Sequence, residues 1–137
     1  MKKQTQKKSL YENLQKDIRD LKLPDIEVWQ NMYADKDYLI QMDVPEFTCI
    51  CPKTGLPDFA KITIAYTPDK SCLELKSFKL YINAYRDVGI FHEHVVNKIL
   101  DDLVIACKPR SISVKGEFNL RGGIKTSVSA EYKTRKK

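Results

Sequence analysis

The chain has 137 residues and a net charge of +6, with 42% hydrophobic and 31% charged residues. This length fits one domain with a hydrophobic core, and the composition is typical of a soluble globular protein rather than a disordered one. No run approaches the roughly 18 consecutive apolar residues of a membrane span. The lysine-rich start lacks the apolar segment of a secretion signal. We therefore predict a single cytoplasmic domain over residues 1–137.

The predicted elements begin after an N-terminal arm, residues 1–30. In this arm Leu10, Leu14, Ile18 and Leu21 have the spacing of a short amphipathic helix or a frayed segment. In chain order the pattern then predicts a strand at 38–44 ended by Pro45, a strand at 59–66, helices at about 76–85 and 91–107, and strands at 111–118 and 124–132. Residues 126–137 hold the last strand and a basic tail.

The resulting order, β-β-α-α-β-β, predicts an α+β fold. We expect an antiparallel four-stranded sheet with two helices on one face. No Gly-rich phosphate loop is present, so a Rossmann domain is not expected. A sheet of this kind leaves two strand edges open, and edge-to-edge association in a symmetric oligomer would cover them.

The positive charge is concentrated at the two ends of the chain. Residues 1–24 carry a net +4 and residues 131–137 a net +3, which leaves −1 for residues 25–130. A nucleic-acid-binding fold normally carries its basic patch on the folded surface. We therefore interpret the basic ends as solubilising termini and expect no direct binding of tRNA.

The segment from 46 to 58 is the strongest candidate for chemistry. Its two prolines and one glycine predict a stiff, turned loop, with cysteine near its start and Asp58 at its end. A deprotonated thiol is a strong nucleophile, and a carboxyl group can transfer a proton to or from the reacting atoms. The alternative is a small buried cysteine and an ordinary turn aspartate. The cysteines at 49, 51, 72 and 107 are expected to be reduced, and their spacing predicts no metal site.

Four motifs give the chain a resemblance to a known family. They run in the same order from about residue 38 to 125 and consist of segments 46–60 and 74–81, Phe91-His92-Glu93 and Arg121-Gly122-Gly123-Ile124. Together they resemble the NADPH-dependent 7-cyano-7-deazaguanine reductases, the nitrile reductases of queuosine biosynthesis. The short chain resembles the single-module members, whose tunnelling fold assembles β-β-α-α-β-β units into a barrel. The resemblance thus implies a ring-shaped homo-oligomer of two stacked pentamers with active sites between subunits.

The resemblance also implies roles for individual residues. Cys51 would add to the nitrile carbon to give a thioimide, and Asp58 would donate the proton. Two NADPH would then complete the reduction to the aminomethyl product. Substrate binding would fall to Glu93, His92 and Glu74, and cofactor binding to Lys76, Ser77 and Lys79.

Other interpretations of these residues remain open. His92 shares a helical stripe with apolar residues and could be a packed core histidine, while Glu93 could simply complement a helix dipole. Lys76 and Lys79 could form an exposed charged face. At the level of function, the alternatives are a GTP cyclohydrolase-like zinc enzyme of the same fold and an RNA-binding protein with basic tails.

Overall fold

A computed structural model describes residues 14–134 of the chain. Its elements are the 3₁₀ turn η1 (Ile18–Asp20), strands β1 (Val28–Gln30), β2 (Ile40–Ile50), β3 (Pro57–Thr67) and β4 (Ser71–Leu73), helix α1 (Leu75–Asn83), the 3₁₀ turn η2 (Ala84–Asp87), helix α2 (His92–Cys107), and strands β5 (Ser111–Phe118) and β6 (Ser127–Lys133).

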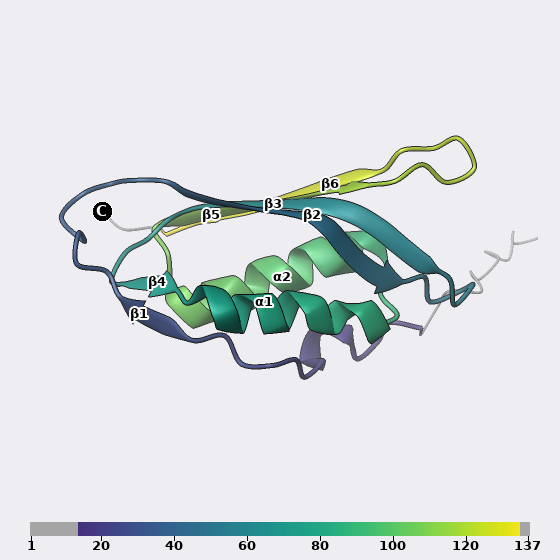
Figure 1. The fold of residues 1–137 in the computed structure, drawn as a ribbon, viewed down its shortest axis with the longest axis horizontal. Coiled ribbons are helices and arrows are strands. Elements are labelled where there is room, and N and C mark those ends of the chain that lie inside the picture. Colours follow the sequence, from purple (N-terminus) through teal and green to yellow (C-terminus); the bar gives the residue numbers. More distant parts are fainter. Residues whose placement is uncertain (1–13, 135–137) are drawn as a thin grey trace, which may run out of the picture.

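Four of the strands form one antiparallel sheet in the order β2-β3-β5-β6. Both helices lie against the same face of this sheet, as Figure 1 shows. The short strands β1 and β4 pair with each other near the start of α1. The predicted α+β class, with a four-stranded antiparallel sheet and two helices on one face, is confirmed.

The core lies between the sheet and the helices because alternate strand residues point toward them. In β3 the residues from Asp58 to Tyr66 alternate between buried and partly or fully exposed positions. Helix α2 contributes a matching apolar stripe, which comprises Val95, Val96, Ile99, Leu100, Leu103 and Cys107. Each fully buried aliphatic or aromatic side chain in such a core contributes about 1.5–3 kcal/mol.

The first long strand continues beyond the predicted end at Pro45. β2 extends to Ile50, and its register with β3 shifts between Val44 and Phe47. Proline is tolerated here because β2 is an edge strand and the shift marks a bulge, so no ladder hydrogen bond is lost. The predicted loop is therefore shorter than expected, with only residues 51–56 between the strands.

Three further features differ from the sequence prediction. The paired strands β1 and β4 were not predicted, because each has only three residues. β6 begins at Ser127 rather than 124, after a turn in which Gly122 and Gly123 adopt positive φ. Where a short amphipathic helix or a frayed segment was expected in the arm, the described residues form the 3₁₀ turn η1, and Leu10 lies outside the described residues.

Three segments far apart in sequence meet at one end of the sheet. These are the β2–β3 turn, the start of α2 and the loop between β5 and β6 (Figure 1). The start of α1 lies beside β4, toward the opposite end. The fold thus brings together three of the four motifs singled out in the sequence and leaves segment 74–81 apart.

Candidate active site

An open depression of about 420 Å³ lies where these three segments meet. The β2–β3 hairpin contributes Cys51 and Asp58, and the start of α2 contributes His92 and Glu93. Phe91 and Arg121 complete the lining. Four of the predicted site residues are therefore brought together around one cavity.

Cys51 is the residue in this depression whose environment favours a thiolate. The turn is closed by two backbone hydrogen bonds, from Cys51 N–H to Leu56 O and from Gly55 N–H to Cys51 O, each 2.9 Å long. A hydrogen bond from the Thr54 side chain and backbone N–H groups of Thr54 and Lys53 lower the pKa of the Cys51 thiol, against the opposing effects of burial and of Asp58. A lowered pKa raises the thiolate fraction at neutral pH, and the thiolate is the nucleophilic form.

Cys49 has the opposite character although it is two residues away. It lies in β2 and is fully buried, with its Sγ 4.0 Å from the carbonyl oxygen of Ile90. Burial, with a contribution from Asp58, raises the pKa of its thiol to about 12. Cys49 is therefore a protonated core residue, which supports the choice of Cys51 as the nucleophile.

Asp58 is a buried carboxylate held between two basic side chains. It lies in β3 opposite Cys49, on the core-facing side of the strand, and is 5% exposed. Its Oδ2 is 3.2 Å from His92 Nε2, and its Oδ1 forms an ion pair with Arg121. The arrangement around Oδ1 does not meet the geometry of a regular hydrogen bond. Because a buried carboxylate is costly without such partners, His92 and Arg121 explain how it is accommodated.

His92 is oriented by stacking as well as by Asp58. Its ring lies parallel to that of Phe118 at the end of β5, with centroids 3.7 Å apart and an interplanar angle of 9°. Gly116 permits this close approach of α2 to the sheet, because a Cβ there would lie 2.8 Å from Val96 Cγ2. The His92 side chain therefore packs against the core and also lines the depression. Glu93, the next residue, is exposed at the rim of the depression.

The remaining predicted residues lie on α1, outside the depression. Glu74 caps this helix, and hydrogen bonds from the backbone N–H groups of Ser77 and Lys76 lower the pKa of its carboxyl. Ser77 is buried, and its Oγ accepts a hydrogen bond from Glu27 N–H at 2.9 Å. Lys76 and Lys79 are exposed. Within one chain these four residues are not brought to Cys51.

Three residues around the site had no role assigned from the sequence. Arg121 was noted only as part of a motif and a turn, because its 63-residue separation from Asp58 hides their contact. Phe118 falls within the strand predicted at 111–118 and Thr54 within the predicted loop, where the predicted element by itself gives neither residue a role. Thr54 follows Cys51 by three residues inside a turn, and the hydroxyl of a threonine at this spacing can hydrogen-bond back to the start of the turn. This spacing is a signal that could have identified Thr54 as a partner of Cys51.

The role of Thr54 gives a pH-dependent prediction. Thr54→Val removes the hydroxyl hydrogen bond that lowers the Cys51 pKa, so the thiolate fraction at pH 7 falls. We expect alkylation of Cys51 by iodoacetamide to slow several-fold at pH 7 and its pH profile to move to higher pH. Thr54→Ser should restore the profile, and Thr63→Val on the outer face of β3 should leave it unchanged. An unaltered profile in Thr54→Val would contradict the role of this hydroxyl.

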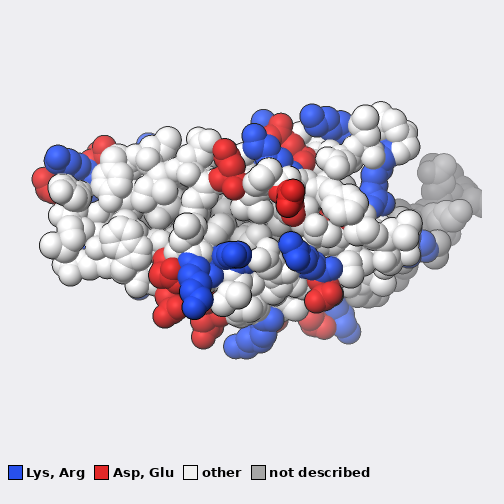
Figure 2. Space-filling view, in the orientation of Figure 1, with Lys and Arg blue, Asp and Glu red and all other residues white. Residues whose placement is uncertain are grey.

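Three further observations concern the alternative functions considered from the sequence, a zinc enzyme and an RNA-binding protein, and the absence of a membrane span. Within residues 14–134, no group of three or more His, Cys, Asp or Glu side chains is arranged to hold a metal ion. On the face drawn in Figure 2, Lys and Arg are interspersed with Asp and Glu rather than gathered in one basic patch. No helix in this part of the chain is long and apolar enough to cross a membrane.

A thiol with a lowered pKa and a buried carboxyl group line one depression on an α+β scaffold, and these are the groups that thiol-dependent enzymes use. A family model described as QueF-like protein matches residues 57–137. The NADPH-dependent 7-cyano-7-deazaguanine reductase of Nitrosococcus oceani is 56% identical over 109 residues, which cover 80% of this chain and 84% of that protein. The protein of the same name from Chlorobaculum tepidum is 58% identical over 107 residues, or 78% of this chain and 92% of that protein. The chain therefore belongs to the QueF-like family.

A solved structure supports the fold independently. The apo crystal structure of the archaeosine synthase QueF-Like superposes with a TM-score of 0.64 and covers 68% of this chain and 91% of that chain. The two are 24% identical, so the likeness concerns the fold.

Proposed function

We propose that this protein is a nitrile reductase that converts 7-cyano-7-deazaguanine to 7-aminomethyl-7-deazaguanine with two NADPH, in the biosynthesis of queuosine in tRNA. The observation that carries the proposal is that Cys51, a thiol with a lowered pKa, lines the same depression as the buried carboxyl group of Asp58. The names of relatives that are 56–58% identical support it.

The first step uses only groups of this chain and the substrate. The Cys51 thiol passes its proton to Asp58, and the resulting thiolate adds to the nitrile carbon. The carbon–nitrogen triple bond becomes a double bond, and Asp58 returns the proton to the nitrogen. The product is a thioimide, with no atom lost from either partner. His92 and Arg121 keep the Asp58 carboxyl group in place while it accepts this proton and returns it.

NADPH, when bound, supplies a hydride for each of the two reductions that follow. After the first, the Cys51 thiolate leaves and an imine remains, so the site must keep water away until the second. Lys76 and Lys79 fit the phosphates of this cofactor in kind, because both are exposed cations on one helix. The test is to mix protein, NADPH and the nitrile and follow the absorbance of NADPH. Consumption of two NADPH per amine supports the proposal, and its absence overturns it; equal rates with NADH would contradict the phosphate role of the lysines.

Recognition of the substrate ring is assigned to Glu93. A carboxylate facing the N–H groups of a guanine-like edge makes charge-assisted hydrogen bonds. We expect Glu93→Ala to weaken nitrile binding by roughly 10-fold to 100-fold, since such bonds contribute about 1.5–3 kcal/mol, with little change for NADPH. Calorimetry on both ligands measures this, with Glu131→Ala on β6 as the control. Similar losses for both ligands would count against the assignment.

We further propose that the whole chain forms one domain that works in the cytoplasm as a ring of two stacked pentamers. Among the described residues, no further strand pairs with the two edge strands of the sheet, β2 and β6. An exposed apolar set lies in and after β1, where much of the surface in Figure 2 is uncharged, and comprises Val28, Trp29, Met32, Tyr33 and Leu39. In such a ring, α1 of a neighbouring subunit supplies Lys76 and Lys79. Light scattering should give a decamer, and a fully active monomer would refute the assembly.

A further inference from the structure

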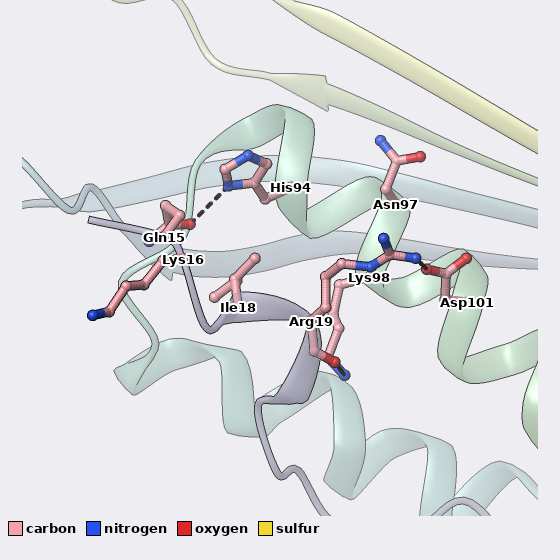
Figure 3. Close-up of a pocket in the computed structure, with 8 residues that line it drawn as sticks. All are labelled: Gln15, Lys16, Ile18, Arg19, His94, Asn97, Lys98 and Asp101. Carbon is pink, nitrogen blue, oxygen red and sulfur yellow. Dashed lines mark hydrogen bonds and ion pairs between the residues drawn. The ribbon is translucent and has the colours of Figure 1, made fainter. Parts of the chain in front are cut away.

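Within the described part of the N-terminal arm, the side chain of Gln15 contacts the start of α2. Gln15 Nε2 donates to the carbonyl oxygen of Gly89 at 3.2 Å. Its Oε1 accepts from the backbone N–H of Phe91 at 3.2 Å and lies 3.0 Å from His94 Nδ1. Figure 3 shows the last contact as a dashed line between the arm and the helix. One amide group thus connects three points within six residues of the chain.

This contact lies directly behind two residues of the proposed site. Phe91 is the N-cap of α2 and makes no side-chain cap of its own, and the next two residues are His92 and Glu93. His92 faces Asp58, while His94 lies on another side of the same turn and meets Gln15. The first turn of α2 is therefore held by contacts on two sides.

The hydrogen bond from Gln15 to Gly89 also lies next to the backbone hydrogen bonds of Ile50, the last residue of β2 before Cys51. Ile50 N–H donates to Val88 O at 2.9 Å, and Ile90 N–H donates to Ile50 O at 3.0 Å. Gly89, which Gln15 holds, lies between these two partners. Because Ile50 precedes Cys51, fixing Gly89 also steadies the chain beside the reactive turn.

Other residues of the arm also contact the core and α2, and these contacts hold the backbone next to Gln15 in place. Ile18 packs against the core, and Lys98 Nζ donates to the carbonyl oxygen of Arg19 at 3.2 Å. In Figure 3 these residues line one pocket between the arm and the helix, with Gln15 at the end toward His94.

We infer that Gln15 is a positioning residue that fixes the first turn of α2, and with it His92 and Glu93, for binding of the nitrile. The part of this inference that concerns the nitrile rests on the proposed function. It gives the arm a role at the site although none of the described arm residues lines the depression that holds Cys51.

The test uses the full chain and three substitutions. Gln15→Met keeps the length of the side chain and removes every hydrogen bond, whereas Gln15→Glu keeps the oxygen acceptors. Lys16→Met, whose side chain lines the same pocket, is the matched control. Hydrogen exchange of the free proteins, followed by mass spectrometry, should be faster over residues 89–95 in Gln15→Met only. The Kd of the nitrile should rise roughly fivefold to tenfold, the scale of one lost hydrogen bond, while that of NADPH stays unchanged. Gln15→Glu should restore most of both properties.

The outcomes separate this inference from the proposed function. If the unmodified protein binds no nitrile, the proposed function fails, and the exchange of residues 89–95 still decides whether Gln15 fixes the turn. Unchanged exchange in Gln15→Met overturns the inference. Equal weakening of nitrile and NADPH, or no restoration by Gln15→Glu, also overturns it, because a general structural defect would produce those results.

Discussion

Replacing Cys51 by alanine is expected to remove the covalent adduct and nearly all turnover. When the unmodified protein is mixed with 7-cyano-7-deazaguanine without NADPH, its mass should rise by one whole substrate molecule, because addition to the nitrile expels nothing. In Cys51→Ala no mass change is expected, and turnover should fall on the order of 10³-fold or more, as when other covalent nucleophiles are lost. Intact-mass spectrometry and NADPH absorbance measure the two results.

Cys49→Ala is the matched control for this experiment. Cys49 is fully buried and its pKa is raised to about 12, so it is a thiol at neutral pH and should not compete for the nitrile. Adduct and turnover should therefore stay largely intact in this variant. A thiol alkylating agent should inactivate the unmodified enzyme, and bound nitrile should protect it. An adduct on Cys49, or turnover in Cys51→Ala, would refute the mechanism even for a member of this family.

The second large effect is expected from Asp58→Asn. The amide keeps the shape of the side chain but cannot donate a carboxylic proton, so turnover should fall on the order of 10²-fold or more. Adduct formation should slow as well, because the nitrile nitrogen gains its proton as the carbon is attacked. Stopped-flow measurement of the adduct and steady-state turnover give the two rates.

A second aspartate provides the comparison for Asp58→Asn. Asp43 is exposed on β2, where it pairs with Thr63 and not with the part of β3 that holds Asp58. Its Oδ1 accepts a hydrogen bond from the Gln41 side chain. Asp43→Asn should leave both rates unchanged. Comparable losses in the two variants, or full activity in Asp58→Asn, would remove Asp58 from its proposed role. Thermal melting of each variant checks that the loss does not come from unfolding after the Arg121 ion pair is removed.

Regular periodicity made part of the fold predictable. The eight-residue strand β5 was predicted with its observed bounds, and α2 within one residue, because each has an unbroken apolar pattern. Pro45 misled the prediction of β2, since the sequence does not reveal that the strand is at an edge and carries a bulge. β1 and β4 form by pairing with each other, which no local pattern in three residues can indicate.

The site was predictable where its chemistry is local in sequence. Cys51 and Asp58 belong to one hairpin, and His92 and Glu93 to one helix turn, so the motifs contain them together. Arg121 reaches Asp58 only through the tertiary fold. Lys76 and Lys79 lie outside the depression, and their proposed contact with NADPH stays a prediction, because a sequence carries no record of symmetry that could bring them to the site of a neighbouring subunit.

The β2–β3 hairpin holds the two proposed catalytic groups on structural units of different stiffness. Asp58 is fixed in a ladder, where its backbone pairs with that of Cys49, whereas Cys51 begins a turn of six residues. Substitutions within that turn can alter the acidity or reach of the thiol while the carboxyl stays in place. Evolution, or an engineer, can therefore tune the proposed nucleophile and the proposed acid one at a time.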